Sequence, residues 1–269
     1  MLWLDCMWTY LAVTGAILWL GVLLAPWQPW RTRECFEVAG SASQDDDLSD
    51  VTVLIPARNE ADVIGEVVAA LGRQGRGLSI IIVDDRSEDG TADAARHAAP
   101  KNCDLEIFLG AELEPGWAGK MWALEQGRKR LTRPLVLLLD GDIALAPGVL
   151  PALLKVKKAK GVVFLSLMAS LDMRGFWQGL LIPAFVYFFK LLYPFHLSNG
   201  RGQLVAAAAG GCILTERYVL EHIGGFAAIQ GAIIDDCSLA RAVKRRGGST
   251  WIGLTHAVTS LRPYNGFNS

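Results

Sequence analysis

The stretch LVLLLDGDIAL, residues Leu135–Leu145, decides the fold expected of this chain. Its first five residues are all apolar, which is typical of a strand buried on both faces of a sheet, and Asp140 and Asp142 follow directly. Residues i and i+2 of extended backbone point the same way, so both carboxylates can reach one point. Gly141 between them allows a close approach of backbone or ligand. Taken alone, an ordinary acidic turn is the simpler explanation of Asp-Gly-Asp, so its meaning depends on the other strands.

Similar apolar runs precede this strand and alternate with helical patterns. The helix after the first run has an apolar face at helical spacing, and Asn59 is expected to cap it, with Asp62 three residues further on. Continuous apolar strands that alternate with helices predict an α/β fold, a mostly parallel sheet with helices on both faces. The expected strands are Val51–Pro56, Leu78–Asp85, Asp104–Gly110 and Leu135–Leu139, with another over Val162–Ser170, and a helix is expected over Gly116–Leu131.

Polar clusters follow three of these strands. In open α/β sheets a ligand binds beyond the carboxyl ends of the strands, so clusters at those ends are expected to converge on one site. Two hard carboxylate donors beside an open face suit Mg²⁺ or Mn²⁺, with phosphate oxygens completing the coordination. The clusters are Pro56-Ala57-Arg58-Asn59-Glu60, Asp84-Asp85 and Asp140-Gly141-Asp142.

The N-terminal segment Met7–Trp27 carries no charge and is long enough to cross a bilayer as a helix. A cleaved signal peptide is the rival interpretation, but the preceding residues hold no Lys or Arg. Arg31 and Arg33 follow the segment, so the positive-inside rule places the rest of the chain in the cytoplasm. We therefore expect a single transmembrane anchor over residues 1–30 in the inner (cytoplasmic) membrane, and a flexible linker over residues 31–50.

A second apolar stretch, Gly175–Phe195, allows three interpretations. A full membrane span would separate Asp236 from Asp142, and Pro183 and Lys190 interrupt the apolar run, so a span is disfavoured. A buried core helix remains open. We favour an interfacial helix that lies against the bilayer and lets a lipid acceptor enter. Residues 51–160 and 161–269 are then two halves of one catalytic body, the second containing this helix.

Composition and charge limit the class of partner. Hydrophobic residues make up 52% of the chain and the mean hydropathy is +0.30, so membrane contact is expected. With 26 basic and 27 acidic residues the net charge is −1, which gives no basic field for nucleic acid. Five cysteines without a CxxC pair predict neither a disulfide framework nor a zinc site. The basic residues Arg241, Lys244 and Arg245 are expected to face water or lipid.

Four motifs in this order resemble family 2 glycosyltransferases of the GT-A fold: IPARNE (Ile55–Glu60), IIVDDRSEDGT (Ile81–Thr91), LLLDGD (Leu137–Asp142) and IIDDCSLARAVKRRG (Ile233–Gly247). EPGWAGKMWALEQG (Glu114–Gly127) and Gly210-Gly211 are also similar to that family. Within it, the chain is most similar to the membrane-bound branch associated with hopanoid biosynthesis. The resemblance covers roughly residues 1–269 and implies a Rossmann-like GT-A sheet, a nucleotide sugar donor, Mg²⁺ or Mn²⁺, a lipid acceptor and inversion at the transferred carbon.

The resemblance also implies a role for each matching position. Asp85 would bind the uracil edge, Asp140 would lie near the ribose or the metal, and Asp142 would hold the metal. Asp236 and Asp235, where the family usually has Glu-Asp, would be the catalytic pair, with Asp236 preferred over Asp235 as the general base. Lys120 is either a cation near the diphosphate or a solvated helix lysine. The nucleotide pocket would further include Pro56, Ala57, Arg58, Glu60 and Asp84, and the acceptor side Gly210 and Gly211.

The C-terminal part departs from the family pattern. Members usually have a Gln/Arg-x-x-Arg-Trp-like element after the base and then membrane helices, and neither follows Asp236 here. Arg262 is either the start of that region or an exposed arginine. The departure leaves an alternative open, a truncated protein that binds nucleotide without transferring sugar. A nucleotidyltransferase is disfavoured, because no Gly-rich basic loop follows the first strand.

Overall fold

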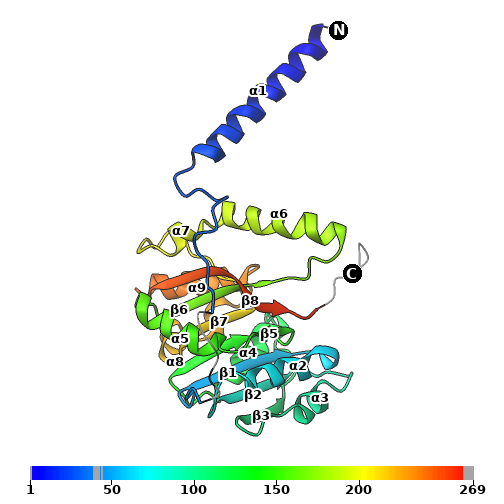
Figure 1. The fold of residues 1–269 in the computed structure, drawn as a ribbon, viewed down its shortest axis with the longest axis vertical. Coiled ribbons are helices and arrows are strands. Elements are labelled where there is room, and N and C mark those ends of the chain that lie inside the picture. Colours follow the sequence, from blue (N-terminus) through cyan, green and yellow to red (C-terminus); the bar gives the residue numbers. More distant parts are fainter. Residues whose placement is uncertain (1, 39–42, 44, 263–269) are drawn as a thin grey trace.

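The computed structural model describes residues 2–38, 43 and 45–262, and within them eight strands form one mixed sheet (Figure 1). The strand order is β3-β2-β1-β4-β7-β6-β8-β5. Strands β3, β2, β1 and β4 are mutually parallel, and β7 joins β4 in the antiparallel direction. The α/β prediction is confirmed. The strands are β1 Val51–Ala57, β2 Ser79–Asp84, β3 Asp104–Leu109, β4 Leu135–Leu139, β5 Ile143–Leu145, β6 Phe164–Ser170, β7 Cys212–Glu216 and β8 Thr250–Ser260.

Helices cover both faces of the sheet because alternate residues of each strand are buried on opposite sides. Val53 and Ile55 of β1 pack in the cluster that includes α2 and α5, whereas Leu54 packs in the cluster of α4, α8 and α9. The sheet helices are α2 Ala61–Gly72, α3 Thr91–His97, α4 Gly119–Arg128, α5 Val149–Lys160, α8 Arg217–Ile223, the 3₁₀ helix η1 Phe226–Ile229 and α9 Asp235–Arg245.

Helix α1, Leu2–Leu24, projects away from this body (Figure 1). Its part from Cys6 to Leu24 is long and apolar enough to cross a membrane, and a signal sequence near the N-terminus would share that property. The segment after α1 is held to the body, because Leu254 donates its N–H to the Glu34 carbonyl (2.7 Å) and the Phe36 N–H donates to the Leu254 carbonyl (2.8 Å).

The expected linker is therefore packed at both ends. Leu48 is buried, and the Leu48 N–H donates to the Arg76 carbonyl. Residues 39–42 and 44 of the expected flexible stretch lie outside the described residues. The small and acidic residues of this segment predicted a flexible linker, and they did not indicate that Leu48 packs in the core.

The second apolar stretch forms α6, Phe176–Leu192, followed by the short α7, Phe195–Ser198. In Figure 1, α6 lies across the end of the body that faces α1. Most of its apolar side chains are exposed, and Phe189 on the inner side packs in a small cluster around Phe195. A buried core helix is not what the structure shows.

Two local predictions are wrong. Asn59 does not cap α2: its backbone has φ = +53°, and its side-chain oxygen accepts the Glu88 N–H instead. The free N–H groups at the start of α2 are satisfied from the next loop, where Asp89 accepts the Ala61 N–H (2.9 Å). A side chain from the loop after β2 therefore takes the place of the cap that the Asn59–Asp62 spacing predicted.

Lys244 is the second correction, because its side chain is buried instead of solvated. Its Nζ donates to the carbonyls of Gly200 (3.1 Å), Gly202 (2.9 Å) and Val205 (2.9 Å). Neighbouring Arg245 is exposed as expected. The helical period does not reveal this role, because the three acceptors belong to a loop about forty residues away.

We predict that Lys244→Met lowers the free energy of unfolding by about 2 kcal/mol, because the three hydrogen bonds of the buried ammonium are lost. The measurement is urea unfolding of the two proteins in the same detergent. Arg245→Met is the matched control and should leave stability nearly unchanged, since Arg245 is exposed. Equal effects of the two substitutions would contradict a specific role for the buried ammonium.

Candidate active site

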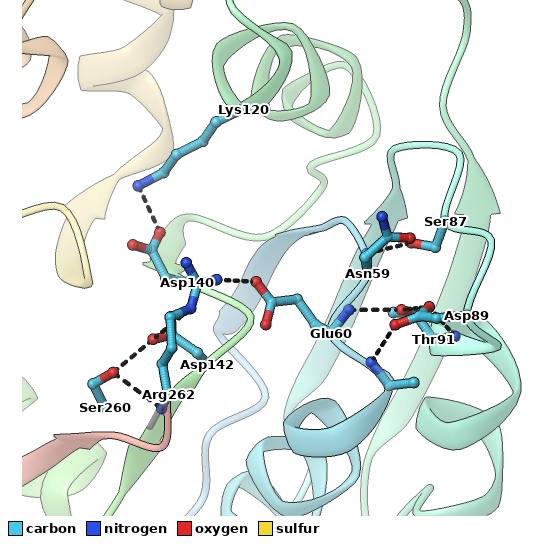
Figure 2. Close-up of polar contacts among 11 residues, drawn as sticks. Asn59, Glu60, Ser87, Asp89, Thr91, Lys120, Asp140, Asp142, Ser260 and Arg262 are labelled. Atoms are coloured by element: carbon cyan, nitrogen blue, oxygen red, sulfur yellow. Dashed lines mark hydrogen bonds and ion pairs between the residues drawn. The ribbon is translucent and has the colours of Figure 1, made fainter. Parts of the chain in front are cut away.

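The loops that follow β1 and β2 are joined by backbone-to-side-chain hydrogen bonds (Figure 2). The Asn59 N–H donates to Ser87 Oγ (3.0 Å), and the Glu60 N–H donates to Thr91 Oγ1 (2.9 Å). Because these strands are adjacent and parallel, their loops meet at one edge of the sheet. The Ser-Glu-Asp-Gly-Thr part of the second loop therefore fixes the backbone from which the Glu60 side chain extends.

The two acids after β4, Asp140 and Asp142, lie beside different cations. Asp140 Oδ1 lies 2.7 Å from the Nζ of Lys120 in the first turn of α4. Asp142 accepts a hydrogen bond from Ser260 Oγ (2.6 Å), and its Oδ2 lies 4.0 Å from Arg262 Nε. Gly141 and Asp142 form a turn between β4 and β5 and not an extended strand. The two carboxylates thus share one cavity but contact different partners (Figure 2).

Arg262, two residues after the end of β8, lies between Glu60 and Asp142 and contacts both. One of its guanidinium nitrogens donates to Glu60 Oε1, and Glu60 and Asp142 are each only 15% exposed. Burial raises the pKa of the Glu60 carboxyl, and Arg262 opposes that rise. Arg262, whose side chain is 56% exposed, thus pairs with two of the acids that line the cleft.

Asp236, in the first turn of α9, lies against the backbone of Gly210. A Cβ at Gly210 would overlap the Asp236 carboxylate, so only glycine permits this approach. Burial raises the pKa of Asp236 to about 7, with Lys120 opposing the rise and Asp235 and Asp140 adding to it. A carboxyl with a pKa near 7 can both accept and release a proton at neutral pH.

Lys120 is the cation at the centre of this acidic group. Burial by itself would lower the pKa of Lys120, but the carboxylates of Asp140 and Asp236 outweigh burial and raise it. The ammonium therefore stays charged at neutral pH. Of the two interpretations left open for Lys120, the structure places it in the site and not on a solvated helix face.

Asp85 lies where β2 ends and is buried. Its Oδ2 is 3.6 Å from Arg58 Nη1. A Cβ at Gly119 would be 2.8 Å from Asp85 Oδ2, so the absence of a side chain there allows α4 to begin beside the carboxylate. Asp84 instead points into its own turn, where it accepts the Ser87 N–H (3.0 Å).

These groups surround one cleft of about 700 Å³, a volume typical of small-molecule sites. Asp84 does not line it, and Asp235 and Gly210 line a smaller pocket beneath Lys120 and Asp140. The remaining predicted site residues all line the cleft: Pro56, Ala57, Arg58, Glu60, Asp85, Lys120, Asp140, Asp142, Gly211 and Asp236.

Sequence reasoning missed one wall of the cleft. Phe185 and Phe189 of α6 and Ile234 before α9 line it beside Asp236. Ser260 was also missed, although it donates to Asp142. The apolar character of Gly175–Phe195 was the available signal for the aromatic wall, but it did not indicate which face of the helix turns inward.

The carboxylates fit a divalent cation only with help from a ligand. Among the described residues, no group of three or more His, Cys, Asp or Glu side chains is placed to hold a metal ion. Mg²⁺ is commonly held by one or two carboxylates together with substrate phosphates. Asp142 and Asp140 supply such a minimal set, and Lys120 and Arg262 contact the same carboxylates.

The arrangement combines a polar floor with an apolar wall. Arg58, Lys120 and Arg262 supply positive charge for an anion, and Asp236 adds a carboxyl whose pKa burial raises to about 7. The adjoining Phe185 and Ile234 can contact an apolar molecule. A cleft of this kind can bind an anionic ligand and an apolar hydroxyl compound side by side.

The family described as "Glycosyltransferase like family 2" matches residues 49–267 of the chain. Among curated proteins, 4,4'-diaponeurosporenoate glycosyltransferase of Staphylococcus haemolyticus is 28% identical over 95 residues, 35% of this chain and 24% of that protein. Undecaprenyl-phosphate 4-deoxy-4-formamido-L-arabinose transferase of Serratia proteamaculans is 30% identical over 120 residues, 42% of this chain and 35% of that protein. The chain thus aligns with only about a quarter to a third of these relatives' length.

Solved structures share the fold. Mannosyltransferase PcManGT from Pyrobaculum calidifontis, in complex with GDP-Man and Mn²⁺, has a TM-score of 0.67 at 23% identity, covering 96% of this chain and 69% of that one. TarS 1-349 of S. aureus, in complex with UDP-GlcNAc, has a TM-score of 0.55 at 15% identity, covering 80% of this chain and 59% of that one. At these identities the likeness concerns the fold, and it supports the GT-A assignment.

We predict that Asp236→Asn stabilises the folded protein above pH 7. Folding raises the pKa of Asp236 from 3.8 to about 7, so the folded state binds the proton more tightly. Stability therefore falls as pH rises between these two values and then levels off. Asparagine resembles the neutral carboxyl and avoids this loss. Thermal unfolding should show a gain for the variant at pH 8 that shrinks toward pH 4; a gain independent of pH would contradict the raised pKa.

Proposed function

Because this chain belongs to the Glycosyltransferase like family 2, we propose that it is a membrane-anchored, inverting enzyme that transfers a sugar from a nucleotide diphosphate sugar to a lipid acceptor. The observation that carries the proposal is the position of Asp236, which lies in one cleft with the strand-end residues of β1, β2 and β4. We propose a UDP-linked donor. A hopanoid as the acceptor rests on the sequence resemblance alone.

The donor is proposed to occupy the polar floor. Asp85, paired with Arg58, is placed to accept hydrogen bonds from the base edge. Lys120 and Arg262 supply positive charge for the diphosphate. A ligand at this place lies beyond the carboxyl ends of β1, β2 and β4, where open α/β sheets bind nucleotides.

A divalent cation is proposed to act with Asp142 and Asp140. When bound, Mg²⁺ or Mn²⁺ supplies Lewis-acid stabilisation of the charge that develops on the leaving diphosphate. The protein's own part is to present the two carboxylates in the turn after β4 and to keep Lys120 beside Asp140. PcManGT, solved with GDP-Man and Mn²⁺, shares the fold and so supports testing Mn²⁺ first.

Asp236 is proposed to be the general base. It takes the proton of the acceptor hydroxyl while that oxygen attacks the anomeric carbon, and the bond to the diphosphate oxygen breaks on the opposite side of the sugar. A single displacement of this kind inverts the anomeric centre. Asp235 lines the smaller pocket beneath the cleft, so it is proposed to tune the charge of Lys120 and not to contact the acceptor.

Membrane attachment is proposed to involve two elements, with α1 as an uncleaved anchor in the inner (cytoplasmic) membrane and α6 as an interfacial helix. Phe176, Trp177 and Phe188 are among the exposed apolar residues of α6, and such a face suits the boundary between headgroups and acyl chains. Arg31 and Arg33 after α1 support a cytoplasmic catalytic body. Residues 51–160 are proposed as the donor half and 161–269 as the acceptor half.

We predict that Asp236→Asn lowers the transfer rate by about a hundredfold or more, the usual contribution of a general base, while UDP affinity changes little. Asp235→Asn is the matched control and should retain most of the rate. Product formation with radiolabelled UDP-sugars and extracted lipids measures transfer, and calorimetry measures UDP binding.

Retained turnover in Asp236→Asn would contradict the base assignment. UDP binding by the unmodified protein without any product would instead favour the alternative function, a nucleotide-binding protein that transfers no sugar.

A further inference from the structure

A second chamber of about 400 Å³ lies on the side of α6 that faces the sheet. Its walls come from the segment after α1, the inner side of α6, the end of β6 and the middle of β8. The lining includes Trp30 from the segment after α1, Ile182 and Tyr187 from α6, and Leu254 from β8. The segment that leads from the apolar N-terminal helix therefore forms part of a cavity in the body.

The chamber and the active-site cleft are neighbours that share a wall. Met168, Ala169, Leu171 and Val186 line both cavities. The cleft contains Asp236, Phe185 and Phe189, and the chamber continues on the other side of the Val186 position of α6. A chain-like molecule with one end at Asp236 could thus extend past this shared wall into the chamber.

The lining is mainly apolar, and its lysine is already paired. Lys190 is buried. Its Nζ donates a hydrogen bond to the Arg31 carbonyl and lies 3.6 Å from Glu34 Oε2. Lys190 also lies 5.3 Å from the centre of the Phe195 ring. A buried ammonium that is satisfied in this way ties α6 to the segment after α1, and it leaves little positive charge for a phosphate in the chamber.

The chamber lies beside elements suited to lipid. The outer side of α6 exposes apolar residues such as Leu180 and Leu181, both more than half exposed, and α1 is long and apolar enough for a membrane. Because residues of α6 line the chamber, an apolar chain bound along α6 lies next to it. Burying methylene groups there is favourable, because it removes apolar surface from water.

We propose that this chamber holds the apolar chain of the lipid acceptor while the acceptor's hydroxyl lies at Asp236. The inference rests on the proposed function and adds the site that selects a long-chain alcohol over a water-soluble one. In this arrangement the segment after α1 has two roles: it tethers the body to the membrane and forms one wall of the lipid site.

The test uses a long-chain fatty alcohol that carries a terminal diazirine, added to the full-length protein in lipid nanodiscs. Ile182→Trp fills the chamber at a residue that lines the chamber and does not line the cleft. Leu181→Trp is the matched control, because the neighbouring Leu181 is exposed and lines neither cavity. Cross-linked peptides are identified by mass spectrometry, and UDP affinity is measured on the same samples.

We expect cross-links on the peptides that contain Trp30 and Ile182–Tyr187. Ile182→Trp should reduce them about tenfold, the loss expected when about two methylene groups can no longer be buried. Leu181→Trp should leave them unchanged. Cross-links confined to outer residues such as Leu180, or insensitive to Ile182→Trp, would overturn the proposal.

A second measurement applies even if Ile182→Trp does not fold. Cys35 lines the chamber and its side chain is exposed, so hexyl methanethiosulfonate can place a short alkyl chain there. Treatment with this reagent should block cross-linking of the protein that has Cys35 but not of Cys35→Ser. Equal cross-linking of the two treated proteins would overturn the proposal. Failure to bind UDP would contradict the proposed function separately, because cross-linking in the chamber does not require a donor.

Discussion

The parallel pairing of β2, β1 and β4 is the constraint on which the site depends. Ala57 is paired with Asp84 across β1 and β2, and Leu54 with Leu138 across β1 and β4. This register brings the end of each strand to one edge of the sheet, so Arg58, Asp85 and Asp140 meet without any contact being local in sequence. A shift of one residue would turn every side chain of a strand to the other face and disperse the cleft.

Gathering carboxylates at one edge creates repulsion that the fold must offset. Asp140 and Asp142 each raise the pKa of Glu60, and Asp140 raises that of Asp236. Lys120 and Arg262, from α4 and from the end of β8, supply the opposing charge. Both cations contact carboxylates that a metal or diphosphate would approach under the proposed function, so a donor bound in that way would rearrange these ion pairs. Before any ligand enters, five acidic and three basic residues line the cleft, so the repulsion among the carboxylates is only partly offset.

Sequence alone predicted what depends on neighbours in the chain. The apolar runs that end in acids gave the strands and most of the cleft, because burial and period are local signals. It did not predict contacts between distant residues: Arg262 with Glu60, Lys244 with the loop at Gly200, and the loop after β2 that replaces Asn59 as the cap of α2. It also missed the turn at Gly141, because a two-residue step assumes extended backbone.

The central claim, that the acids after β4 belong to a nucleotide diphosphate site, is tested most directly by calorimetry of UDP binding in detergent. The unmodified protein and Asp142→Ala are each titrated with Mn²⁺ and with a chelator. The account predicts binding that depends on Mn²⁺ in the unmodified protein and is lost in Asp142→Ala. Equal binding by both proteins, with or without the metal, would contradict the claim.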